Sequence, residues 1–199
     1  MIFKENSLSL DFTNYKAHKG SLLIAEPFML DGYFKRSVVL LAIHNEKEGT
    51  LGFIVNKPIK NVALSDIVKP FENATDWPIY FGGPVQTTSL FYIHRLGDLV
   101  EDSKEIADGI FFGGDFKIIQ ELVKKDEATP QDIKFFLGYS GWGENQLEEE
   151  IARNSWLTTT AKQTLVFNDK LNQYEWWRKA VYQTPHFYVA NFPENAFLN

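Results

Sequence analysis

The sequence predicts a single mixed-sheet domain of the α/β or α+β class, and three observations support this prediction. Apolar segments of strand length alternate irregularly with helical patterns, so a regular βαβ repeat fits less well. Residues 37–43 are apolar at every position except the first, which is typical of a strand buried on both faces. The 199 residues include 17 Phe, 8 Tyr and 5 Trp, which is ample material for a core.

Strands are expected where short apolar runs end at Gly, Pro or Asn. The turn-rich residues 45–49 predict a hairpin between strands 37–43 and 51–55. In chain order, the expected strands cover residues 21–25, 37–43, 51–55, 78–81, 89–94, 109–112, 133–137 and 164–167. Residues 1–19 are polar and form an N-terminal arm to the domain, which spans residues 1–199.

Three helices are expected from capping signals and apolar periodicity. Asp115 can cap a helix whose apolar stripe contains Ile118, Ile119, Leu122 and Val123. A second helix follows residue 143, with Leu147 and Ile151 facing inward and an outer i,i+4 pair of Glu149 and Arg153. A third, at 173–182, buries some of its apolar and Trp side chains, and the aromatic tail 185–199 is expected to pack across the body.

Composition excludes several classes of function. Without cysteine, the chain has no disulfide, no thiolate zinc site and no cysteine nucleophile. With 26 acidic against 20 basic residues, the net charge of −6 makes direct nucleic-acid binding an unfavoured function. No window has the length of a membrane span and no segment resembles a signal peptide, so we expect a cytoplasmic protein without membrane contact.

Residues 136–151 are the most distinctive segment of the chain. An apolar run leads into a loop with Gly138, Gly141, Trp142 and Gly143, and an acidic helix follows. The loop has neither the dinucleotide glycine order nor a Walker lysine. The four nearby glutamates, Glu144, Glu148, Glu149 and Glu150, would repel an anion from the helix N-terminus. We interpret the loop as a structural turn for Trp142, and if it binds a ligand we expect an uncharged or cationic one.

Several motifs, in order, resemble the YqgE/AlgH family of bacterial proteins. They are residues 22–28 (LLIAEPF), 34–41 (FKRSVVLL), 52–58 (GFIVNKP), 82–85 (GGPV), 138–147 (GYSGWGENQL) and 191–195 (NFPEN). The resemblance implies an α/β fold with a bifurcated sheet curled into a pseudo-barrel, flanked by helices. Members are often labelled transcriptional regulators, but the family supplies no catalytic residues. Gly82, Gly83 and Pro84 are expected to form a structural loop, like the glycines around Trp142.

One polar cluster is the best candidate ligand site. If strands 37–43 and 51–55 pair, Arg36 lies near Asn56 and Lys57 at the end of the ladder away from the turn. Asp31 and Glu26 precede Arg36 and could converge on the same place. The alternative interpretation is a salt-bridged strand end without a ligand.

Other polar residues carry weaker hypotheses. Arg36 and His44 share a face of one strand but lie ~26 Å apart if it is straight, too far to act together. His44 and His94 have no second ligand at metal spacing, and Ser140 lacks the nucleophile-elbow motif. We therefore expect no metal, no cofactor and no catalytic residues.

Two functions remain open on this sequence. The first is a non-enzymatic binding or regulatory protein that acts through a protein partner or a small ligand, such as a transcriptional regulator without direct DNA contact. The second is a hydrolase or transferase, in which Arg36 and Lys57 hold a small anionic metabolite and a carboxylate acts as base. A deep pocket lined by the cluster would favour the enzyme, and a flat aromatic surface would favour a binding protein.

Overall fold

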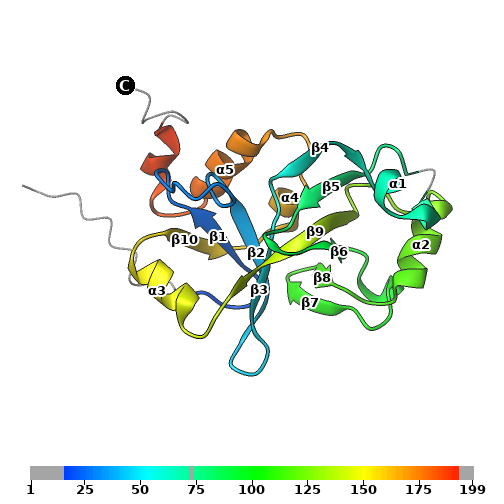
Figure 1. The fold of residues 1–199 in the computed structure, drawn as a ribbon, viewed down its shortest axis with the longest axis horizontal. Helices are drawn as coiled ribbons and strands as arrows, with labels where there is room; N and C mark the ends of the chain where they lie inside the picture. Colours follow the sequence, from blue (N-terminus) through cyan, green and yellow to red (C-terminus); the bar gives the residue numbers. More distant parts are fainter. Residues whose placement is uncertain (1–15, 72–73, 193–199) are drawn as a thin grey trace, which may run out of the picture.

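The computed structural model describes residues 16–71 and 74–192, and in them ten strands form one sheet (Figure 1). Most of the predicted N-terminal arm and the end of the predicted tail lie outside these residues. The strands are β1 Ser21–Ala25, β2 Val38–Asn45, β3 Gly49–Ile54, β4 Pro58–Ala63, β5 Pro78–Phe81, β6 Val85–His94, β7 Lys104–Ala107, β8 Ile110–Phe112, β9 Ile133–Trp142 and β10 Trp156–Thr160.

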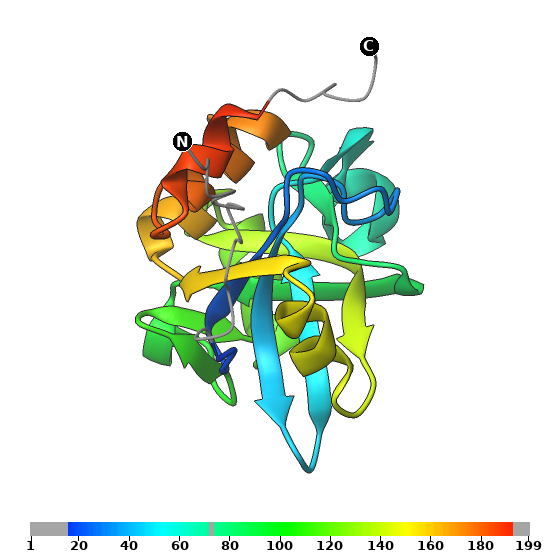
Figure 2. The same cartoon turned by 90° about the vertical axis from the view of Figure 1, so that its left-hand side faces the viewer.

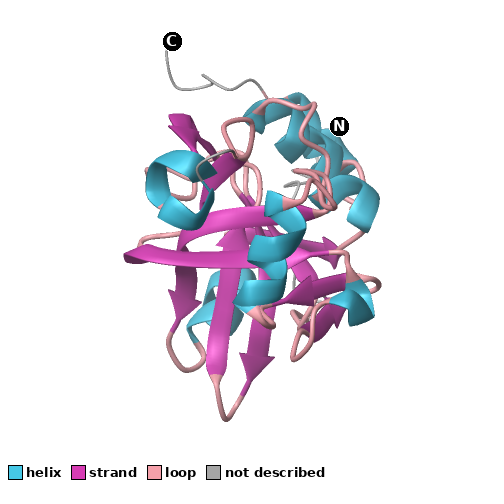
Figure 3. Cartoon of the chain, turned by 90° about the vertical axis from the view of Figure 1, so that its right-hand side faces the viewer, coloured by secondary structure: helices cyan, strands magenta, loops and turns pink. Residues whose placement is uncertain are grey.

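Helices lie around the strands (Figure 3), with α1 and α2 at one end of the molecule and α3 at the other (Figure 1). They are α1 Leu64–Ile67, α2 Phe116–Lys124, α3 Gln146–Ala152, α4 Gln163–Val166 and α5 Gln173–Val181. Three 3-10 turns, η1 Lys69–Phe71, η2 Gly97–Leu99 and η3 Phe187–Asn191, complete the described elements.

The sheet branches at β9, as a bifurcated sheet does. The main path runs β10-β1-β2-β3-β9-β6-β8-β7, and β4 and β5 lie off it. The start of β9 pairs with β5 in parallel, at Phe135 to Leu137, while its end pairs with β3 antiparallel, at Ser140 to Trp142. β6 pairs along most of β9 as well. The mixed α/β class and the bifurcated sheet, curled into a nearly closed barrel, are therefore confirmed.

Glycines allow the two branches to approach each other closely. Gly138 has a φ of +70° in the middle of β9, which explains a glycine at this bend. A Cβ added at Gly82 or Gly83 would overlap the backbone of Gly138 or Tyr139. Gly82 also donates from its N–H to Leu137 O and accepts from the N–H of Ile54, so it connects both branches.

Three hydrophobic clusters pack around the sheet. Leu22 and Ile24 of β1 face the largest cluster, which α4 and α5 cover, whereas Leu23 and Ala25 face the cluster under α3. β2 alternates in the same way, so both strands are buried on both faces, as predicted for 37–43. The third cluster lies between β5, β6, β9 and the helices α1 and α2.

Most predicted elements are present in the structure. The β2–β3 hairpin pairs as expected, with Val39 opposite Ile54 and Asn45 opposite Gly49. Asp115 caps α2 by accepting a hydrogen bond from the N–H of Lys117 at 2.8 Å. Leu147 and Ile151 of α3 are buried, and Glu149 pairs with Arg153 at 3.4 Å. η3, in the predicted aromatic tail, buries Val189 and Ala190.

Two predictions of local structure are wrong, and some elements were not predicted. The expected strand 164–167 is the helix α4, because burial of Leu165 and Val166 against the main core outweighs their β-propensity. The expected glycine-rich loop 138–143 is instead strand as far as Trp142, since Gly141 and Ser140 pair with β3. The strands β4, β7 and β10, the helix α1 and the 3-10 turns η1 and η2 were not predicted.

Candidate functional site

Arg36 lies enclosed where the segment 26–36 meets α5, and only 3% of it is exposed. Its guanidinium carbon is 4.0 Å from the centroid of the Trp177 ring and 5.5 Å from that of Tyr174. Nη2 donates to Phe192 O at 3.2 Å. A cation on an aromatic face stabilises the contact, so Arg36 fastens the start of β2 to α5 and to Phe192.

Asn56 is buried beside Arg36 and connects three parts of the chain. Its Oδ1 accepts from the N–H of Val38 at 2.9 Å, and its Nδ2 donates to Arg36 O at 2.9 Å and to Gln173 O at 3.1 Å. An amide nitrogen has two donors, and both are used here. These bonds hold the end of β3 against β2 and α5.

The two predicted carboxylates shape the segment 26–36. Glu26 accepts from the N–H of Phe28 at 2.8 Å, and Asp31 accepts from the N–H groups of Tyr33 and Phe34 at 2.8 and 3.0 Å. Burial raises the pKa of Glu26, although the Phe28 N–H and the charge of Arg36 oppose the shift. Side chains that bond their own backbone in this way set the turns of a connecting segment.

Lys57 lines a cavity at the outer side of the cluster. Burial lowers its pKa to about 8, against the opposing charge of Asp31, and its Nζ donates to Tyr33 O at 2.6 Å. The cavity has a volume of about 360 Å³ and is also lined by Tyr33, Phe81 and Gln173. The five predicted residues therefore gather at one end of the hairpin. Arg36 and Asn56 are buried there, whereas Glu26, Asp31 and Lys57 are partly or fully exposed. That they bind a ligand stays a prediction.

Lys134 is a buried lysine that no sequence motif indicates, and it lies against Val55 and the Tyr80 ring. Nζ of Lys134 is 3.1 Å from Oδ1 of Asp169, donates to Val55 O at 3.3 Å and sits 4.0 Å from the centroid of the Tyr80 ring. Tyr80 also donates to Asp169 at 2.7 Å. Burial lowers the pKa of Lys134 to about 8, although Asp169 opposes this. The one available signal was a lysine inside an apolar strand.

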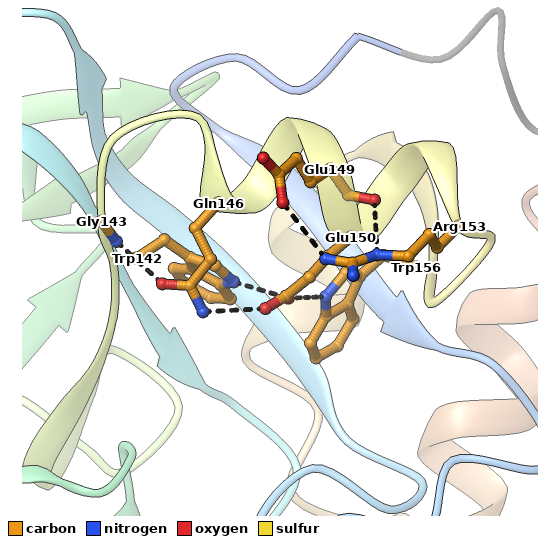
Figure 4. Close-up of polar contacts among 7 residues, drawn as sticks. All are labelled: Trp142, Gly143, Gln146, Glu149, Glu150, Arg153 and Trp156. Carbon is orange, nitrogen blue, oxygen red and sulfur yellow. Dashed lines mark hydrogen bonds and ion pairs between the residues drawn. The ribbon is translucent and has the colours of Figure 1, made fainter.

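Trp142, at the end of β9, contributes to a second group of polar contacts (Figure 4). Oε2 of Glu150, on α3, accepts from the indole nitrogens of Trp142 and Trp156 at 2.9 and 2.8 Å. Gln146 donates to Oε1 of Glu150 at 2.9 Å and accepts from the N–H of Gly143 at 2.9 Å. Trp142, Gln146, Glu150 and Trp156 line a cavity of about 350 Å³ together with Asp31 and others.

A larger cavity of about 610 Å³ lies between the β2–β3 hairpin and the start of α3, which are neighbours in Figure 2. His44 places Nδ1 2.8 Å from the hydroxyl of Thr50 and Nε2 3.6 Å from Glu148. Glu46 and Glu144 line the same cavity. Arg36 and His44 thus mark opposite ends of β2, in agreement with their spacing in the sequence.

The Thr50–His44–Glu148 arrangement combines the group types of a hydrolytic triad but not its geometry. Thr50 and His44 are cross-strand partners in the hairpin, which by itself explains their contact. The 3.6 Å separation between His44 and Glu148 exceeds hydrogen-bond reach, so the carboxylate does not hold the imidazole as a triad requires. Within the described residues, no three His, Asp or Glu side chains are grouped as metal ligands.

Large apolar side chains are exposed on the segment 26–33 and on residues 182–192. Leu30 is 80% exposed and Tyr33 55% exposed, and Phe28 packs edge-on against Phe192 with centroids 4.9 Å apart. We call this set the aromatic surface; it contains Phe28, Leu30, Tyr33, Tyr182, Phe187, Tyr188 and Phe192. The Phe28–Phe192 contact brings the segment 26–33 next to the end of the segment 182–192.

The fold and these sites define a curled, bifurcated-sheet protein with acidic cavities around α3 and an exposed aromatic surface. An AlgH-like family model matches residues 22–187, so the chain belongs to this family. It is 39% identical over 186 residues to a UPF0301 protein of Chlorobium limicola, covering 92% of this chain and 97% of that one. A UPF0301 protein of Parabacteroides distasonis is 39% identical over 184 residues, covering 91% of each.

Two solved structures resemble the fold. The solution structure of the AlgH protein from Pseudomonas aeruginosa has a TM-score of 0.67 at 27% identity, covering 85% of this chain and 92% of that one. The crystal structure of protein DIP2367 from Corynebacterium diphtheriae has a TM-score of 0.73 at 18% identity, covering 93% and 100%. The resemblance drawn from the sequence motifs is confirmed. In the described part, no helix is both long and apolar enough to cross a membrane.

Proposed function

We propose that this protein is a non-enzymatic regulatory protein that acts by binding another protein through its aromatic surface. The observation that carries the proposal is the exposure of Leu30 and Tyr33 on the same segment as Phe28, which packs against Phe192. Exposed apolar patches rimmed by polar groups are typical of protein-binding sites, and aromatic residues are enriched there. The net charge of −6 favours regulation through a protein over direct contact with DNA.

The architecture beneath this surface supports the same function. Arg36, Trp177 and Asn56 lock the segment 26–36 to α5, so the exposed side chains sit on a fixed base. A surface that is ordered before binding loses less conformational entropy when a partner docks. The aromatic surface is therefore suited to specific rather than adaptable recognition.

A capture experiment tests this proposal with matched variants. The tagged protein and its Leu30→Asp and Leu99→Asp variants are used to capture partners from the native bacterial lysate. Leu99 is also an exposed leucine, at 66%, but it lies on η2 away from the aromatic surface. We expect one partner to be retained by the wild type and Leu99→Asp and to be lost from Leu30→Asp, because a buried interface charge is costly. Equal retention by both variants would overturn the proposal.

A second candidate function is an enzyme that acts on a small anionic metabolite, and Lys57 is the observation that favours it. Its amine lines a cavity of about 360 Å³ and has its pKa lowered to about 8, so it could act as a base or nucleophile near neutral pH. Turnover of a phosphate or carboxylate ester that disappears in a folded Lys57→Met variant would support this candidate.

A further inference from the structure

The Glu150 carboxylate is held by neutral donors alone. Two indole N–H groups and one side-chain amide donate to it, at 2.8 to 2.9 Å. In the part of the chain that the structure describes, the Lys, Arg and His ion pairs involve other carboxylates. The half-buried carboxylate of Glu150 therefore has the hydrogen bonds drawn in Figure 4 but no ion pair among these contacts.

Three aromatic rings line the cavity next to this carboxylate. Phe34 and Trp156 meet edge-on with centroids 5.5 Å apart, and Trp142 and Trp156 do so at 6.1 Å. Phe34 lies 6.4 Å from Trp142 at a tilted angle, so the three rings pack against one another at angles, with Trp156 2% and Trp142 8% exposed at the cavity wall. Aromatic faces attract cations electrostatically, and rings arranged at angles form the cages that bind quaternary ammonium groups.

The acidic lining of the cavity also favours a cation. Asp31 joins Glu150 in its lining, and none of the described residues that line it is a lysine or an arginine. The neighbouring cavity on the other side of α3 is lined by Glu46, Glu144 and Glu148. A cation is attracted by both sides of α3, whereas an anion is repelled by both.

Hydrogen-bonding capacity separates the possible cations. A primary ammonium has three N–H donors that need acceptors, whereas Glu150 has already used three of its about four acceptor sites and Asp31 already accepts from two backbone N–H groups. A hard metal ion needs about six oxygen ligands, and aromatic rings supply none. A quaternary ammonium donates nothing and presents methyl groups to the rings, so it requires only the charge and the aromatic faces.

We propose that the cavity lined by Phe34, Trp142, Trp156, Asp31 and Glu150 binds the quaternary ammonium group of a small molecule. At about 350 Å³ it is within the size range of small-molecule sites, which is about 300–1,000 Å³. This site is separate from the proposed partner-binding function, although Phe34 and Asp31 belong to the same connecting segment as Leu30 and Tyr33. The motif around Trp142 thus gains a role beyond packing.

Titration calorimetry with choline tests the inference, with indole Nε1–H shifts in NMR spectra as a second readout. We expect saturable millimolar binding that moves the Trp142 and Trp156 signals. The neutral isostere 3,3-dimethyl-1-butanol has the same shape without the charge, and we expect it to bind at least about tenfold more weakly. Absence of choline binding, or equal binding of the isostere, would overturn the inference.

Three variants localise the binding. Glu150→Gln removes the charge while keeping an oxygen that can accept from the indoles, and we expect at least about tenfold weaker choline binding. Glu149→Gln removes the same charge one residue away, at the exposed Arg153 pair, and should leave binding unchanged. Phe34→Leu, which removes one ring and keeps Glu150, should weaken it about threefold, which keeps the test decisive if Glu150→Gln fails to fold. Unchanged affinity in folded Phe34→Leu would contradict the site.

Discussion

At the scale of single residues, buried charged side chains hold separate segments of the chain together. Arg36 lies under the Trp177 ring, and Lys134 pairs with Asp169 beneath Tyr80. Each of these cations connects segments that are distant in the sequence. The grouping of Arg36, Asn56 and Lys57 could be predicted from hairpin register alone. The Lys134–Asp169 pair could not, because nothing in the sequence indicates that the turn before α5 folds back over β9.

The Lys134–Asp169 pair carries a prediction for stability. Lys134→Met leaves the Asp169 carboxylate without its cation and Val55 O without its donor, so we expect a loss of about 3 kcal/mol in the free energy of unfolding. The double variant Lys134→Met with Asp169→Asn removes both charges and should lose less than the single variant. Urea denaturation of the two single variants and the double variant measures the coupling. Additive losses would mean that the two charges do not interact.

At the scale of elements, the glycines that follow β5 and those within β9 determine how the sheet divides. Gly82 and Gly83 lie against the backbone of Gly138 and Tyr139, where the two branches of the sheet separate. Gly, Pro and Trp together are typical of turns, so the sequence predicts structural loops at these glycines. The structure instead puts Gly138 and Gly141 within β9, because pairing with β3 and β6 extends the strand through them.

Gly83→Ala should therefore destabilise the protein severely. The added methyl group would overlap the backbone of Tyr139 and Ser140, and neither the connection 82–84 nor β9 can move away without losing backbone hydrogen bonds. We expect a loss of more than about 3 kcal/mol or failure to fold, as for overpacking combined with backbone strain. Gly32→Ala is the matched control, because nothing lies within 4 Å of its added Cβ. Thermal unfolding of both variants checks this. Similar melting temperatures would contradict a structural role for the close contact between Gly83 and β9.

At the scale of the whole molecule, burial patterns predicted more than local propensities did. The fully apolar stretch 37–43 correctly indicated a strand with a core on each side. Short elements such as α4 and β10 were missed or assigned wrongly, since their conformation depends on what packs against them. The cavities around α3 were equally hidden, because they need His44, Trp142 and Trp156 from three separate strands. That the chain is one domain stays a prediction.

The central claim is that the protein works by presenting its aromatic surface to another protein. Site-specific photo-crosslinking in the cells that naturally produce the protein tests it most directly, with the crosslinking residue placed at position 30 or, as the control, at position 99. We expect one discrete protein adduct from position 30 and none from position 99, because only the former lies on the aromatic surface. Adducts from position 99 alone, or none from position 30 in a folded and expressed protein, would contradict the account.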